Sequence, residues 1–96
     1  MKRQGDLVFK QIEELPKGLK RVAGNVIVKG ESTGHAHRLV GGDVLKDKKG
    51  LMFLMIGNKG SVVHEEHKTI DLEKGYYAVI RQREYTMKDM TRLVVD

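Results

Sequence analysis

Closely spaced glycine turn signals divide this chain into short β-prone runs, and that spacing constrains the fold more than any other feature. The 96 residues include eleven glycines and one proline, and turn signals recur about every eight to twelve residues. The runs between them are too short for long amphipathic helices. Because tight turns between short strands need residues that tolerate positive φ, we expect an all-β, antiparallel barrel or sandwich.

The pattern predicts eight strands, with hairpin turns between most of the later ones. The strands are expected at residues 7–12, 26–29, 35–40, 44–46, 51–56, 61–64, 69–72 and 76–85. The turns are expected at residues 41–43, 47–50, 57–60 and 73–75. Thr86 is a candidate N-cap for a short C-terminal helical turn over residues 86–90, and residues 93–95 can add a last strand.

The length of the chain allows one hydrophobic core, so residues 1–96 are predicted to form a single all-β domain. The apolar run over residues 51–56 predicts a strand that is buried on both faces. The predicted core consists of Phe9, Ile27, Leu39, Leu51, Phe53, Met55, Val79 and Ile80.

The composition excludes several classes of site. The chain has no cysteine, which rules out a disulfide framework, a cysteine zinc site and a thiol nucleophile. The longest apolar run is too short to span a membrane, and no signal-peptide pattern follows Met1. We therefore expect a soluble, cytoplasmic protein that has no membrane partner.

All four histidines occur in two tight pairs, which are the most specific chemical feature of the sequence. His35 and His37 are two residues apart and share one face of a strand. His64 and His67 are three residues apart, within reach of each other in a turn. If the fold brings the pairs together, the imidazoles could hold a divalent transition metal such as zinc, iron, manganese or nickel.

Two carboxylates lie between the histidines of the second pair. Glu65 or Glu66 could complete the coordination, orient a ligating imidazole, or act as a catalytic base on a metal-bound water. The alternative is that the four histidines are unrelated core or surface residues, or that they bind an anion or a partner directly. The sequence leaves these alternatives open.

A second group of candidate site residues lies at the end of the longest predicted strand. Arg81, Arg83 and Tyr85 alternate along it and share one face. Two guanidiniums beside a ring could hold a phosphate, a carboxylate or a stacked base, and we take them as candidates for binding an anionic substrate. The same side chains could instead form cross-strand ion pairs.

The net charge of +5 is concentrated in the first half of the chain. Residues 1–50 contain eleven Lys and Arg against six Asp and Glu, whereas residues 51–96 contain seven of each kind. A basic half can attract nucleic acid or another polyanion, or it can be an ordinary solvated surface. No zinc finger, recognition helix or aromatic platform motif is present to decide for nucleic acid.

Residues 33–37, 64–67 and 81–85 resemble segments of an uncharacterised family of small bacterial β-proteins. That resemblance covers most of the chain and implies no activity. The spacing of His35 and His37 is also loosely similar to the first metal motif of cupins. The sequence departs from cupins because no glutamate follows His37 closely and no Pro-x-Gly precedes the second pair.

These features predict a histidine-lined site that binds a divalent metal and acts on a small anionic substrate. Metal-assisted hydrolysis or isomerisation would be the natural reaction class for an enzyme of this kind. The alternatives are a nucleic-acid- or protein-binding module that uses the basic half, and a structural β-unit. We expect the chain to form a homo-oligomer.

Overall fold

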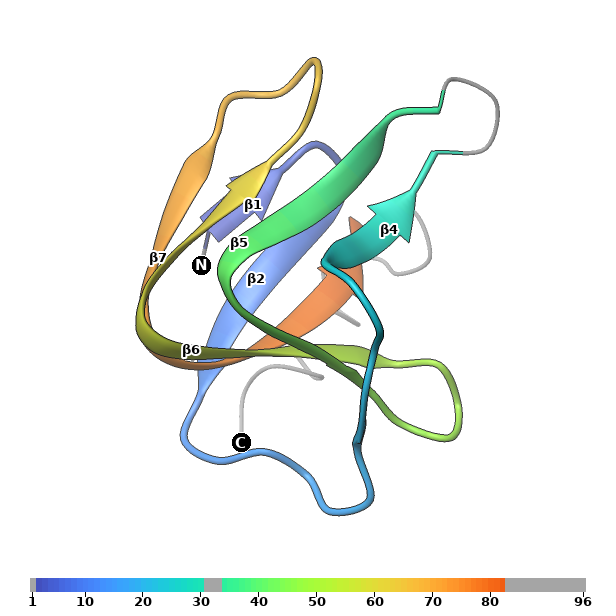
Figure 1. The fold of residues 1–96 in the computed structure, drawn as a ribbon, viewed down its shortest axis with the longest axis vertical. Helices are drawn as coiled ribbons and strands as arrows, with labels where there is room; N and C mark the ends of the chain where they lie inside the picture. The colour runs from blue at the N-terminus through green and yellow to red at the C-terminus, as the bar shows by residue number, and fades with distance from the viewer. Residues whose placement is uncertain (1, 31–33, 83–96) are drawn as a thin grey trace.

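The computed structural model of the chain describes residues 2–30 and 34–82, and these residues form one antiparallel sheet (Figure 1). Its strands are β1 (Lys2–Gln4), β2 (Leu7–Ile12), β3 (Lys20–Arg21), β4 (Val26–Lys29), β5 (Ala36–Lys46), β6 (Met52–Val63) and β7 (Ile70–Arg81). The predicted all-β antiparallel fold is confirmed. The predicted helical turn over residues 86–90 and the strand over residues 93–95 lie outside the described residues.

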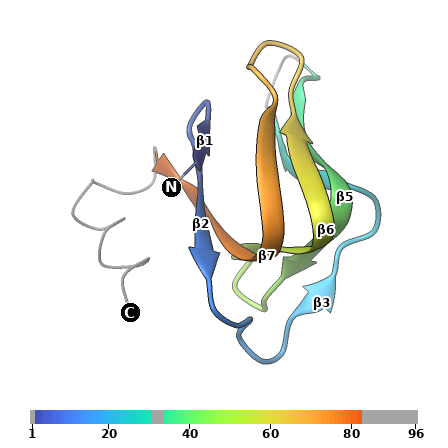
Figure 2. The same ribbon diagram turned by 90° about the vertical axis from the view of Figure 1, so that its left-hand side faces the viewer.

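The sheet rolls around its core but does not close into a barrel. Its strands follow the order β1-β2-β7-β6-β5-β3, and β4 also pairs with β5. Figure 2 shows β2, β7, β6 and β5 following one another around the curve. Within the described residues, β1 and β3 end the order and no backbone pairing joins them. The result is one bent sheet whose two halves pack against each other.

Three strands are longer than the sequence predicts. The chain runs without reversal through residues 41–43, 57–60 and 73–75, so the turns predicted there are wrong. β5 and β6 remain paired from one end to the other, with Arg38 opposite Val63 and Lys46 opposite Met52. The turn predicted at residues 47–50 is confirmed, because the Asp47 amide donates a 3.0 Å hydrogen bond to the Leu51 carbonyl.

Glycine bends these long strands instead of ending them. The register of β5 against β6 shifts between Val40 and Gly42, and Gly41 has a φ of 88°. A Cβ on Gly41 would collide with the carbonyl oxygen of Lys59 on the neighbouring strand. A bulge with glycine at positive φ increases the local bend of a sheet. The sheet can therefore roll over its own core at this point.

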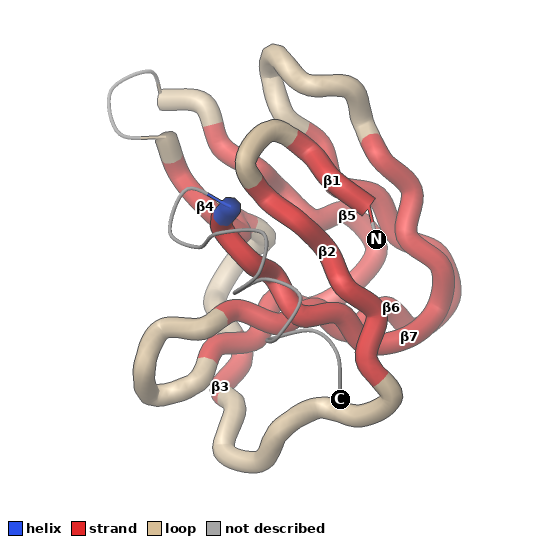
Figure 3. Tube along the Cα trace, turned by 180° about the vertical axis from the view of Figure 1, so that it is seen from behind, coloured by secondary structure: helices blue, strands red, loops and turns tan. Residues whose placement is uncertain are grey.

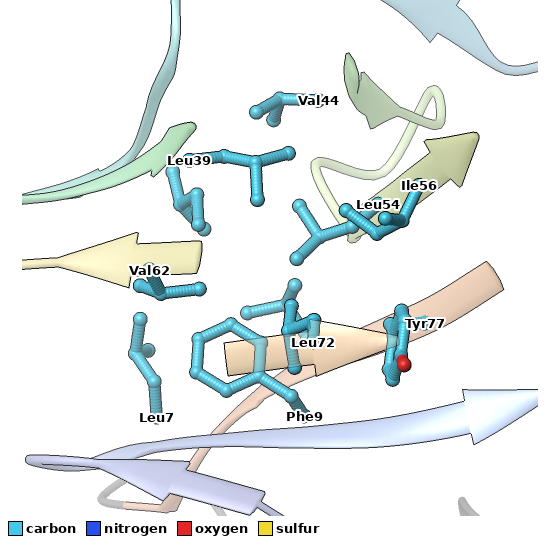
Figure 4. Close-up of a cluster of buried hydrophobic side chains, with 11 residues drawn as sticks. Leu7, Phe9, Leu39, Val44, Leu54, Ile56, Val62, Leu72 and Tyr77 are labelled. Carbon is cyan, nitrogen blue, oxygen red and sulfur yellow. The ribbon is translucent and has the colours of Figure 1, made fainter. Parts of the chain in front are cut away.

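The core lies inside the roll and draws side chains from five strands (Figure 4). Six of the eight predicted core residues are buried: Phe9, Ile27, Leu39, Phe53, Val79 and Ile80. Met55 is half-buried. Leu51 is 45% exposed, so its prediction as a core residue is wrong. The apolar run begins at Leu51, before β6, and within β6 the consecutive residues Phe53 and Leu54 are both buried.

Different loops lie at the two ends of the rolled sheet. The β1–β2 turn and the β6–β7 loop come together at one end, beside the residues that flank the β4–β5 connection (Figures 1 and 3). The turn between β5 and β6 lies at the other end, beside the segment that contains β3. All four histidines belong to the first end.

Within the described residues, no helix is both long enough and apolar enough to cross a membrane.

Candidate functional site

The structure brings the two histidine pairs into contact. The ring centroids of His37 and His64 are 4.4 Å apart, and those of His64 and His67 are 4.5 Å apart. The His37 and His67 rings are 5.9 Å apart, and the His35 ring lies 5.7 Å from that of His64. The two pairs are separated by 26 residues in sequence but share one site. They meet because the pairing of β5 with β6 extends to the strand ends that lie next to His37 and His64.

Glu65 fastens the loop of the second pair to the strand of the first pair. Its carboxylate accepts a 3.0 Å hydrogen bond from the Ala36 amide and a 2.9 Å bond from the Arg38 guanidinium. These bonds, first of all the one from the Ala36 amide, lower the pKa of the Glu65 carboxyl. Ala36 lies between His35 and His37, so this contact fixes the distance between the two pairs.

His37 is the buried member of the group, and a glutamine determines its tautomer. His37 is 6% exposed, and its Nδ1 lies 2.8 Å from the side-chain oxygen of Gln4, which is 3% exposed. The Gln4 amide nitrogen donates to the carbonyls of Val62 and Lys68, which identifies the other amide atom as oxygen. Since that oxygen can only accept, His37 carries its proton on Nδ1 and presents a lone pair on Nε2.

Burial favours the neutral form of the His37 imidazole. Desolvation of the ring lowers the pKa of His37, and the neighbouring His64 and His67 lower it further. Asp6 and Glu65 act in the opposite direction, and the net direction is downward. A neutral imidazole whose Nδ1–H is held by an acceptor is the form in which histidine usually binds a metal through Nε2.

The two histidines of the β6–β7 loop are held less firmly. The Glu66 amide donates a 3.0 Å hydrogen bond to Nδ1 of His64, which places the proton of neutral His64 on Nε2. His67 packs its ring against Gly5, where a Cβ would lie 2.8 Å from Nε2. Gly5 has a φ of 60°, so glycine serves both the turn and the close approach of the ring.

An open pocket of about 240 Å³ lies over these rings. The four histidines line it together with Asp6, Val28, Lys29, Gly30, Glu66 and Arg81. The His35 ring also pairs with the Glu66 carboxylate across 3.4 Å. We call this the histidine pocket. Two cationic side chains, Lys29 and Arg81, and two carboxylates, Asp6 and Glu66, line it beside the imidazoles, so the pocket offers partners to both signs of charge.

The distances between the histidine rings are compatible with one shared metal ion, but the orientations of the rings are less so. Two imidazoles on a tetrahedral ion have ring centroids about 5 Å apart, given metal–nitrogen distances near 2 Å. The centroid separations of 4.4 to 5.9 Å in the structure bracket that value. However, the His37 and His67 rings are parallel to within 9°. In the described part of the chain, no three His, Asp or Glu side chains stand ready to hold a metal ion.

The sequence-predicted site residues are distributed unequally. The four histidines, Glu66 and Arg81 line the pocket, whereas Glu65 is engaged beside it. Arg83 and Tyr85 lie outside the described residues. For all of the sequence-predicted site residues, the assigned roles in metal binding, catalysis and substrate binding stay predictions. Sequence reasoning missed Gln4, because one glutamine at the end of a three-residue strand carries no local signal.

A family model described as "Domain of unknown function (DUF8820)" matches residues 3–82. The chain belongs to this family. The matched range includes every residue of the histidine pocket and Gln4, and it excludes Arg83 and Tyr85. The resemblance to an uncharacterised family is thus confirmed, whereas the bacterial origin and the likeness to cupins stay predictions. No curated protein and no solved structure matches the chain.

Proposed function

We propose that this domain binds a divalent transition-metal ion in the histidine pocket and presents it to a small anionic ligand. The observation that carries the proposal is the clustering of the four imidazoles, in which His64 and His67 lie beside buried His37, whose tautomer Gln4 determines. His37 is the anchoring ligand, and His64 and His67 are the next two. His35 lies at the rim, where it serves as a fourth ligand or leaves that position open.

The hydrogen bonds of the site support unequal roles for these ligands. The Gln4–His37 contact is the arrangement that orients metal-binding histidines in proteins, with the non-ligating nitrogen donating to a fixed oxygen. To bind the metal, His64 gives up its bond from the Glu66 amide, and ligation through Nε2 also requires its proton to move to Nδ1. Losing one such bond costs about 1 kcal/mol. Structural zinc sites in peptides release about 10 to 16 kcal/mol, so metal binding can drive this adjustment.

The chemistry of the donors favours a metal that prefers nitrogen. Imidazole nitrogens suit zinc, iron and nickel, whereas manganese prefers oxygen ligands. Two carboxylates, Asp6 and Glu66, line the pocket, and that of Glu66 pairs with His35. Glu66 is therefore the candidate for an acid–base role on a metal-bound water, while Glu65 positions the loop.

The cations of the pocket support an anionic second ligand. Lys29 and Arg81 both line the pocket, and they approach it from β4 and β7. Because Asp6 and Glu66 offset the charges of Lys29 and Arg81 in the lining, the bound metal would supply the net positive charge that attracts the anion. Small carboxylates and phosphates fit a pocket of about 240 Å³.

The test is zinc titration of the full chain, produced without a histidine tag and freed of metal by chelation. Isothermal titration calorimetry should show one zinc per chain in the wild type. A His37→Ala, His64→Ala double variant should lose this binding. In long-range ¹H–¹⁵N spectra, His37 should change from an Nδ1–H imidazole with a free Nε2 to one whose Nε2 shift reports metal ligation.

A matched control separates this site from adventitious binding. Glu13 and Glu14 are exposed carboxylates on the loop after β2, and neither is among the residues that line the pocket. A Glu13→Gln, Glu14→Gln variant should bind zinc as the wild type does. The proposal is wrong if the wild type binds no stoichiometric zinc, or if the histidine variant, still folded by circular dichroism, binds as well as the wild type.

A further inference from the structure

A second concave surface lies at the opposite end of the rolled sheet, and it is basic. Two adjoining hollows of about 260 and 470 Å³ flank the β5–β6 turn and share Gly18, Asp47 and Lys48. We call them together the basic groove. Its cationic side chains are Lys17, Lys20, Arg21, Lys46, Lys48 and Lys49. All six residues are exposed.

The carboxylates near the groove leave most of this charge uncompensated. Asp43 pairs with Arg21. The Asp47 carboxylate accepts the amides of Lys49 and Leu51, at 2.9 and 2.8 Å, and so stabilises the turn. Within residues 2–30 and 34–82, no carboxylate forms an ion pair with the five lysines of the groove.

The register of the sheet brings two of these lysines face to face. Lys20 on β3 lies directly opposite Lys46 on β5. Like charges in opposite positions on neighbouring strands destabilise a sheet. A bound anion would remove that repulsion, so the arrangement favours an occupied groove over an empty one.

We propose that the basic groove binds the phosphate backbone of a nucleic acid without reading its sequence. Several lysines along a concave surface can each contact a phosphate and release counterions, which supplies most of the affinity of non-specific binding. The residues that line the groove include no aromatic side chain. Base stacking therefore has no platform here, and a duplex, whose phosphates are regularly spaced, suits the surface better than a single strand.

The same surface is poorly suited to a lipid bilayer. Leu51 is the one large hydrophobic side chain of the groove that is strongly exposed among the described residues. Insertion into a membrane interface needs a wider apolar face than one leucine supplies. The surface is also hollowed on both sides of the turn, which matches a convex phosphate backbone.

The experiment compares two charge variants of equal size in the full chain. Fluorescence anisotropy measures binding to a short labelled DNA duplex of mixed sequence between about 20 and about 200 mM salt. The wild type should bind at low salt and weaken steeply as salt rises. Lys46→Gln, Lys48→Gln should weaken binding at least tenfold at low salt and make the slope of log K against log salt shallower by about 1 to 2.

The control is Lys59→Gln, Lys74→Gln, which removes the same charge from exposed residues outside the groove. It should bind within about twofold of the wild type. The groove variant should not melt earlier than the wild type, because it loses a repulsion, and it should still bind one zinc if the histidine pocket does. This last readout separates a failure of the groove from a failure of the pocket.

Three outcomes would overturn the proposal. The first is no binding of duplex at low salt. The second is equal weakening in both variants, which would show an effect of net charge alone. The third is preferential binding, through the same lysines, to vesicles rich in phosphatidylserine, which would make the groove a lipid-headgroup surface.

Discussion

The two ends of the rolled sheet contain similar numbers of titratable side chains, but they are held in different ways. At the histidine end, hydrogen bonds fix the orientations of the side chains: Gln4 holds His37, and Glu65 holds the backbone between His35 and His37. At the basic end, the lysines point into solvent, and the one carboxylate inside the turn is used to hold the backbone.

This difference indicates which kind of ligand each end can select. A metal ion needs a few donors at fixed distances, so a buried and oriented imidazole is useful to it. A phosphate backbone needs positive charge over an area and tolerates mobile side chains. The histidine end is therefore the candidate for a small, geometry-dependent ligand, and the basic end for a large, charge-dependent one.

The first prediction concerns the bend in the sheet, on which both ends of the roll depend. Gly41→Ala should destabilise the fold by about 3 kcal/mol, because φ is positive there and the new Cβ would collide with the Lys59 carbonyl. Both ends should lose binding together. Urea unfolding measures the effect.

Gly57→Ala is the matched control for the bend. Gly57 lies in the same bent region of the sheet, but no atom lies within 4 Å of where its Cβ would be, and its φ is not positive. Its free energy of unfolding should change by less than about 0.5 kcal/mol. If both variants unfold alike, the close approach at Gly41 is not what the bend requires.

The second prediction affects the histidine end alone. Gln4→Leu removes the acceptor of His37 Nδ1–H and the donor to the carbonyls of Val62 and Lys68. Leaving these buried groups unpaired should cost about 2 kcal/mol of stability. Loss of the orienting bond should weaken zinc binding about 10- to 100-fold, while duplex binding at the basic groove should be unchanged.

Gln11→Leu is the control for Gln4→Leu. Gln11 is exposed, and its amide donates one long bond of 3.3 Å to the Lys74 carbonyl. Its loss should cost less than about 0.5 kcal/mol and leave zinc affinity intact. Equal effects of the two substitutions on zinc affinity would argue against an orienting role for Gln4.

The third prediction concerns the loop that joins the two histidine pairs. Glu65→Ala should expose the Ala36 amide, which would then exchange its hydrogen for deuterium faster. Glu66→Ala should leave that amide protected, because the Glu66 carboxylate contacts His35 and not Ala36. Unchanged exchange at Ala36 in Glu65→Ala would show that the carboxylate does not hold the loop.

The sequence predicts the fold class and most of the segments that lie in strands, because alternating apolar residues and glycine spacing are local signals. It does not distinguish a glycine that reverses the chain from one that bends it. Residues 41–43 have the composition of a hairpin turn, yet β5 continues through them, since residues 44–46 pair with the same neighbour as residues 38–40. That choice depends on long-range pairing.

The histidine pocket, like the fold, depends partly on local sequence and partly on long-range pairing. The sequence identifies the four histidines, because they are rare and paired, but their meeting depends on the pairing of β5 with β6. Gln4 and Lys29 could not be found from local sequence, since short polar segments such as β1 carry no period that predicts a strand. The basic groove was visible only as an excess of charge in residues 1–50 until β3 was placed beside β5.

The smallest expected effect tests whether His37 is neutral when it is buried. Its pKa is lowered in the folded state, first by desolvation and then by His64 and His67, against Asp6 and Glu65. The unfolded chain therefore binds the proton more readily, so stability should fall as pH drops below the unfolded value of about 6.5 and level off below the folded pKa. In chelator-containing buffer, the free energy of unfolding of the wild type should decline over this range more than that of His37→Gln. If the free energies of unfolding of the two proteins depend on pH in the same way, His37 is not a buried, neutral imidazole. The histidine end would then have no fixed ring to orient a metal ion.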